Sequence, residues 1–74
     1  MSKRVFRLDY LPDVEFTMGF ELLSGMTVPE QGEAVLAVLP TRQVELKIIS
    51  QPSVTMLNNS SIICTFRVLQ VDTA

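Results

Sequence analysis

The sequence contains no histidine, a single cysteine and only three glycines among its 74 residues. Without histidine, the chain lacks the side chain that most often acts as a general base near neutral pH. A serine nucleophile would need a lysine base, and neither Lys3 nor Lys47 forms a recognisable catalytic pattern with a serine. We therefore expect a protein that is not an enzyme and has no catalytic residues.

Metal and cofactor sites are equally hard to build from these residues. One cysteine cannot form an intrachain disulfide, and without histidine it cannot complete a cysteine-based metal site. The carboxylate pairs Asp13/Glu15 and Glu30/Glu33 lack a third ligand and the spacing of a calcium loop. The glycines form no phosphate-binding loop before a helix. We expect no cofactor and no metal, and we interpret Cys64 as a small core residue.

Targeting and membrane signals are also missing. The basic N-terminus is followed by Asp9 rather than by an apolar segment, so it does not resemble a secretory signal. The longest uncharged run, from Ile48 to Phe66, contains Pro52 and the polar block 58–61, and cannot cross a membrane as one helix. We expect no membrane span and cytoplasmic synthesis, with incorporation into a viral or other large assembly left open.

Charge is unevenly distributed, although the net charge is only −2. Residues 9–33 contain no basic side chain and six acidic ones: Asp9, Asp13, Glu15, Glu21, Glu30 and Glu33. An acidic zone repels nucleic acid, whose binding requires clustered Lys and Arg, and it favours a basic protein surface. The alternative is that these acids are solvated positions that keep the strands soluble.

The apolar content is high for so short a chain. The length corresponds to one domain, residues 1–74, and a domain of this size has a marginal core. Yet 47% of its residues are hydrophobic. Self-association or docking on a larger partner would bury this surface, whereas a monomer with a few exposed aliphatic side chains is the simpler alternative.

The clearest pattern lies in residues 14–22, which alternate strictly between apolar and polar side chains. Successive side chains of a strand point to opposite faces, so this period of two predicts a half-buried strand. The apolar positions predicted to face inward are Val14, Phe16, Met18, Phe20 and Leu22. The positions predicted to face outward are Glu15, Thr17, Gly19 and Glu21.

The segment before this strand alternates in the same way. Residues 4–10 place Phe6, Leu8 and Tyr10 on one face, and the following Leu11–Asp13 has the composition of a turn. We therefore predict a hairpin between the first strand and the strand at 14–22. Residues 24–32 contain two glycines and a proline and are predicted to form the longest loop.

The rest of the chain is also rich in strand patterns. Residues 33–39 are ambiguous between a buried strand and a short helix, although the bounding Gly32 and Pro40 favour a strand. Further strands are predicted at 43–49, 53–57 and 61–71, with a hairpin turn at 58–61, where asparagine can adopt a positive φ. The predicted fold is all-β: a small antiparallel barrel or sandwich of about five to six short strands.

These observations favour a non-enzymatic protein–protein interaction module. It would be a small subunit of a larger assembly, such as an accessory or decorating component of a viral particle. The candidate interaction residues are outward-facing apolar side chains and acids of the base-free segment: Glu15, Glu21, Leu23, Met26, Val28, Glu30, Ile49, Ile63 and Leu69.

Two alternatives remain at this stage. The first is a small inhibitor that docks on a larger enzyme through its acidic segment 9–33. The second is an oligonucleotide-binding β-barrel, for which Arg4, Arg7, Lys47 and Arg67 would have to form one basic surface. The acidic balance and the placement of the aromatic residues on core faces argue against nucleic acid.

Overall fold

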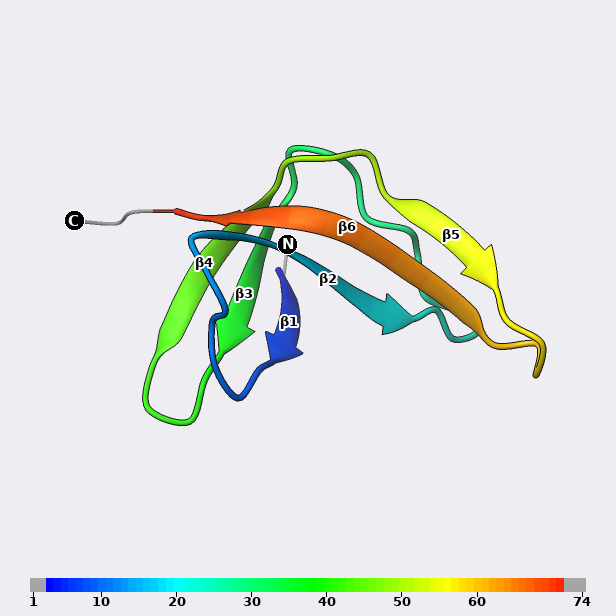
Figure 1. Ribbon diagram of the computed structural model, residues 1–74, viewed down its shortest axis with the longest axis horizontal. Helices are drawn as coiled ribbons and strands as arrows, with labels where there is room; N and C mark the ends of the chain where they lie inside the picture. Colours follow the sequence, from blue (N-terminus) through cyan, green and yellow to red (C-terminus); the bar gives the residue numbers. More distant parts are fainter. Residues whose placement is uncertain (1–2, 72–74) are drawn as a thin grey trace.

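The computed structural model describes residues 3–71 and shows one mixed β-sheet that curls into a half-barrel (Figure 1). All six elements in this part of the chain are strands, and this confirms the all-β prediction. Their bounds are β1 Arg4–Arg7, β2 Glu15–Glu21, β3 Ala34–Val38, β4 Gln43–Ile48, β5 Ser53–Met56 and β6 Ile62–Gln70. The ambiguous segment 33–39 is therefore a strand, and Val35 and Ala37 within it are fully buried.

The order of strands differs from the predicted N-terminal hairpin. The sheet runs β1-β3-β4-β6-β2, and β5 pairs with β6 beyond the end of β4. β1 lies parallel to β3, so it is not the hairpin partner of β2, and the prediction of that hairpin is wrong. The connection between β1 and β2 instead crosses from one end of the sheet to the other. The remaining pairings are antiparallel, as predicted.

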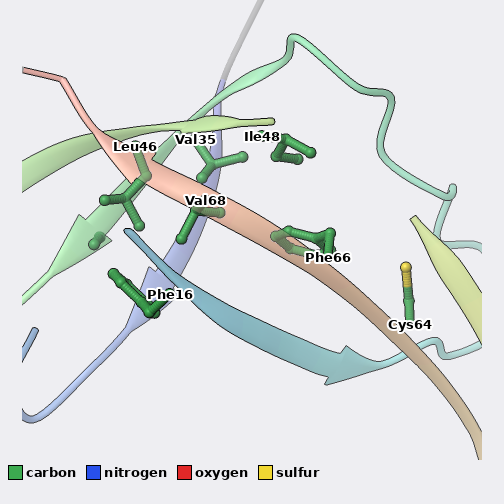
Figure 2. Packing of buried hydrophobic residues seen from close by; sticks show 8 residues of the cluster. Phe16, Val35, Leu46, Ile48, Cys64, Phe66 and Val68 are labelled. Carbon is green, nitrogen blue, oxygen red and sulfur yellow. The ribbon is translucent and has the colours of Figure 1, made fainter. Parts of the chain in front are cut away.

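Curling of the sheet encloses the core on its concave side (Figure 2). The side chains of this core are Phe16, Val35, Ala37, Leu46, Ile48, Cys64, Phe66 and Val68. The rings of Phe6 and Phe20 lie 5.4 Å apart, and both lie 6.2 Å from Phe66. Because β1 and β2 are at opposite ends of the strand order, these contacts join the two ends of the sheet across the core. The contact between β1 and β2 is thus made by packed aromatic side chains and not by backbone hydrogen bonds between the two strands.

The predicted faces of the strands are largely confirmed. Phe16 is only 8% exposed, while Glu15, Thr17, Gly19 and Glu21 are exposed as expected. Val14 and Tyr10 are exceptions, with 59% and 69% of their surface exposed. Both lie outside the regular strands, where the alternation no longer fixes a face. They are therefore not core residues, contrary to the prediction.

Between β4 and β5 the chain leaves the regular ladder. The Ile49 amide donates to the Arg67 carbonyl at 2.9 Å, and Ser53 is already opposite Thr65. The advance of four residues from Ile49 to Ser53 therefore corresponds to an advance of only two residues on β6, from Arg67 to Thr65. The Ser50 hydroxyl accepts the Arg67 amide hydrogen at 2.9 Å and replaces the missing backbone partner. This irregularity coincides with Pro52, which cannot donate to a ladder.

The predicted turn at 58–61 joins β5 to β6. The Leu57 amide donates to the Ser61 carbonyl at 2.7 Å, and the Asn59 side chain accepts the Ser61 amide hydrogen at 3.0 Å. The residue with a positive φ is Ser60, at 70°, rather than either asparagine. Asn59 contributes to the turn through its side-chain oxygen instead.

Candidate interaction surface

Within residues 3–71, three strands of the sheet pair on one side only. β1 pairs with β3, and both β2 and β5 pair with β6. The unpaired side of a strand presents backbone N–H and C=O groups that can bind another strand. Only β5, with the sequence Ser-Val-Thr-Met, has no charged side chain, because β1 contains two arginines and β2 two glutamates.

The hydrogen bonds of the hairpin define which groups of β5 face its free edge. The Leu57 amide donates to Ser61, so this pair is of the hydrogen-bonded type. Because bonded and non-bonded pairs alternate in an antiparallel ladder, Thr55 and Ser53 also bond to β6. The N–H and C=O groups of Val54 and Met56 therefore point away from β6, toward the unpaired edge.

The side chains of β5 are also exposed. All four residues of the strand lie at the surface. Val54 and Met56 share the concave face with their partners Cys64 and Ile62, but they remain 49% and 69% exposed. Leu57, which follows the strand, is 46% exposed. The side chains on the concave face are therefore less well covered at this end of the half-barrel.

Loop 22–33 places more apolar side chains near the same end. The Leu22 amide donates to the Ile62 carbonyl at 2.7 Å, so the loop starts beside the β5–β6 hairpin. Farther along, Val28 and Pro52 line a common cavity of about 350 Å³. In the described residues, nine large hydrophobic side chains are exposed. Six of them come from loop 22–33 and the neighbouring β5–β6 hairpin, and we call this set the hairpin-end surface: Leu23, Met26, Val28, Val54, Met56 and Leu57.

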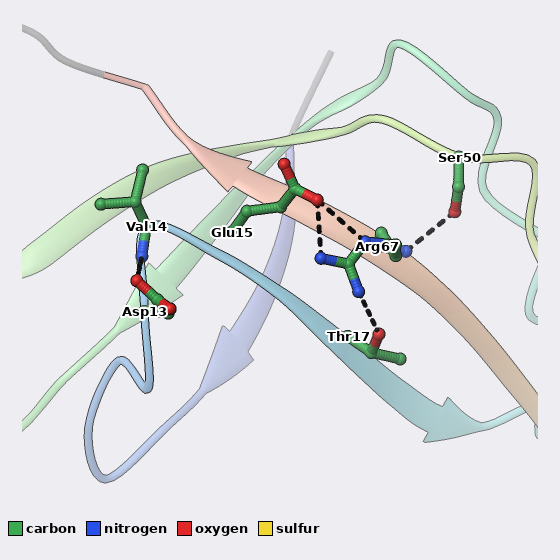
Figure 3. Close-up of polar contacts among 6 residues, drawn as sticks. All are labelled: Asp13, Val14, Glu15, Thr17, Ser50 and Arg67. Carbon is green, nitrogen blue, oxygen red and sulfur yellow. Dashed lines mark hydrogen bonds and ion pairs between the residues drawn. The ribbon is translucent and has the colours of Figure 1, made fainter.

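The opposite, convex face of the sheet is polar at its centre (Figure 3). The Arg67 guanidinium donates two hydrogen bonds to Glu15 Oε2, at 2.6 and 3.0 Å, and one to Thr17 Oγ1 at 3.1 Å. Both charged side chains are nearly half exposed, so this pair adds at most about 1 kcal/mol to stability. Its main effect is to neutralise part of the acidic segment.

A second ion pair lies at the edge of the concave side. Arg4 Nε donates to Glu33 Oε2 at 2.8 Å, and Arg4 Nη2 donates to Thr27 Oγ1 at 2.8 Å. These contacts fasten loop 22–33 to β1. With Arg4 and Arg67 both paired to acids, two of the four cations of the hypothetical basic surface are neutralised.

Cys64 lies in the core, as predicted from its place in the strand. Burial raises the pKa of the Cys64 thiol, while the positive charge of Arg4 partly opposes this shift. The thiol is therefore further from ionisation than a solvent-exposed cysteine, and it packs as a neutral side chain.

The predicted interaction residues fall into two groups. Glu15, Glu21, Ile49, Ile63 and Leu69 belong to the convex side of the sheet, where the register brings Glu21 beside Ile63 and Glu15 beside Leu69. Leu23, Met26, Val28 and Glu30 lie in the exposed loop 22–33. On the convex side the structure thus places Glu21 next to Ile63 and Glu15 next to Leu69, and it places the other four residues in the loop that follows Glu21.

Sequence reasoning missed the three apolar residues of the hairpin, Val54, Met56 and Leu57. Their signal was present in the uncharged run from Ile48 to Phe66, which includes the whole of β5. The strand was predicted, but a four-residue strand with two apolar side chains on one face does not itself reveal whether that face is covered.

Within residues 3–71, no group of three or more cysteine or acidic side chains is placed to hold a metal ion. The same part of the chain contains no helix that is long and apolar enough to cross a membrane. Comparison of the chain with protein-family models, with curated proteins and with solved structures gives no match.

Proposed function

We propose that this protein is a non-enzymatic interaction module that binds other protein subunits through its hairpin-end surface. The observation that carries the proposal is that six of the nine exposed large hydrophobic side chains in the described residues come from two neighbouring segments, loop 22–33 and the β5–β6 hairpin. Soluble monomers rarely expose large contiguous apolar patches, and such patches commonly mark protein interfaces. Two of the six are methionines, which adapt their shape to a partner.

The finer part of this proposal is a role as a small subunit or decorating component of a larger assembly, for example a viral particle. An apolar end and an unpaired strand allow a domain with a marginal core to gain stability by association. The acidic-inhibitor alternative is less well supported, since Glu15 and Glu33 already form ion pairs within the chain. The same pairs weaken the case for binding oligonucleotides.

Affinity capture from cells that make the protein tests the proposal, with the full chain as bait. Met56→Lys places a charge in the hairpin-end surface, and Val5→Lys is the matched control because Val5 is an exposed residue of β1. We expect proteins retained by the wild type and Val5→Lys to be lost with Met56→Lys. Equal retention by all three proteins would contradict this role of the surface.

A further inference from the structure

We propose that β5 pairs with the β5 strand of a second copy of this chain, in antiparallel orientation about a two-fold axis at Thr55. This inference rests on the proposed function, and it identifies a second copy of the chain as a partner that binds the hairpin-end surface. The resulting dimer would extend one sheet across both copies. Strand addition at an unpaired edge is a common mode of protein association.

The charge distribution makes β5 the free edge that a second copy can pair with. A two-fold interface places each residue near its own equivalent, so a charged edge would repel itself. β1 contains Arg4 and Arg7, and β2 contains Glu15 and Glu21, whereas β5 has no charge. The nearest charged residues along the chain are Lys47 and Arg67. β5 is therefore the free edge best suited to self-pairing.

The backbone groups also fit this register. Val54 and Met56 present their N–H and C=O groups to the free edge, as derived from the Leu57–Ser61 bond. With the axis at Thr55, Val54 of each copy lies opposite Met56 of the other, and the two pairs form about four backbone hydrogen bonds. An axis moved to Val54 would place Pro52 in the ladder, where it has no N–H to donate.

The side chains are compatible with the same arrangement. Val54 and Met56 lie on the concave face, so the two copies would cover each other's exposed apolar surface. The two Thr55 side chains would meet on the convex face as a non-bonded pair, and threonine pairs are favourable across antiparallel strands. One register thus satisfies the backbone and buries the most exposed apolar side chains of the hairpin.

Sedimentation equilibrium of the purified full chain over a concentration series tests the self-association. We expect the mass to rise from monomer to dimer for the wild type and for Met56→Ala, which keeps the backbone N–H. Met56→Pro should remain monomeric, because it removes an N–H that points to the free edge and leaves the hydrogen bonds to β6 in place. Circular dichroism of each variant checks that the fold is retained.

Cysteine cross-linking tests the register. Thr55→Cys places its thiol opposite its own equivalent, at the Cα separation of about 4.5 Å typical of a non-bonded pair, and this allows a disulfide. Ser53→Cys is the matched control, because its equivalent would lie about four residues away along the ladder, at roughly 3.4 Å per residue. Since Cys64 is buried, the introduced thiol is the accessible one. We expect a disulfide-linked dimer with Thr55→Cys and at least a tenfold slower reaction with Ser53→Cys.

Three outcomes would overturn the inference: a wild type that stays monomeric, a Met56→Pro variant that still dimerises, or equal cross-linking by both cysteine variants. A monomeric wild type would leave the proposed function standing if Met56→Lys still abolished capture of other subunits. Conversely, dimerisation through β5 without any captured protein would support self-pairing alone.

Discussion

Gly19 of β2 lies opposite Thr65 of β6, and a methyl group on Gly19 would lie 2.8 Å from both Thr65 Cγ2 and the Cys64 carbonyl oxygen. The register of β2 with β6 is continuous from Glu15 to Glu21, so this glycine does not mark a bulge. It permits a close approach of the two backbones within the longest pairing of the sheet.

Gly19→Ala should therefore destabilise the fold. The added Cβ would contact a backbone oxygen that cannot rotate away, and overpacking of this kind costs about 1–3 kcal/mol. Urea unfolding of the wild type and the variant gives the difference in free energy. Adding Thr65→Ser removes Cγ2 but not the carbonyl contact, so it should recover only part of the loss. A variant as stable as the wild type would contradict the close approach.

Phe16 and Val14 offer a matched pair at the start of β2. Both were predicted to face inward, but Phe16 is buried and Val14 is exposed. Phe16→Ala should cost about 3–5 kcal/mol because it empties a core position. Val14→Ala should change the free energy of unfolding by no more than about 0.5 kcal/mol. Thermal or chemical unfolding measures both, and similar losses would show that Val14 is also part of the core.

Arg4 should stabilise loop 22–33 through Glu33 and Thr27. Both members of the ion pair are partly buried, so we expect Arg4→Met to cost about 1–2 kcal/mol. Amide hydrogen exchange should accelerate in residues 27–33. Arg4→Lys should recover only part of this, because lysine lacks the directed donors of a guanidinium. The exposed Arg7→Met serves as control, and equal exchange in all variants would exclude the anchoring role.

Cys64 should make stability depend on alkaline pH. Because burial raises the folded pKa of its thiol, the unfolded thiol ionises first, and the folded chain binds more protons above about pH 8.5. The buried neutral thiol thus makes its full contribution to the free energy of unfolding below that pH. This contribution is lost as the pH rises through the folded pKa. The stability advantage of the wild type over Cys64→Ala should shrink between about pH 7 and pH 10. Parallel stability curves would contradict this.

Much of the fold follows from local patterns. Alternation identified β2 and β6 and assigned Phe16, Cys64 and Phe66 to the core side, because the direction of a side chain in a strand depends only on its own backbone. The strand at 33–39 was favoured by another local feature, because Gly32 and Pro40 bound this short apolar segment. The pairing of β1 with β3 did not follow, since Arg4 and Val35 are distant in sequence and nothing in either strand specifies its neighbour.

Some features of the candidate surface also follow from the sequence, and others only from the tertiary structure. The sequence determined that residues 48–66 carry no charge and that Val54 and Met56 share a face. Only the tertiary structure decided that this face lies beyond the core and that their backbone groups are free. Likewise, it paired Arg4 with Glu33 and Arg67 with Glu15 across 29 and 52 positions of the chain. Side-chain alternation is a local property of the backbone, whereas strand partners and exposed edges depend on how the whole sheet curls around its core.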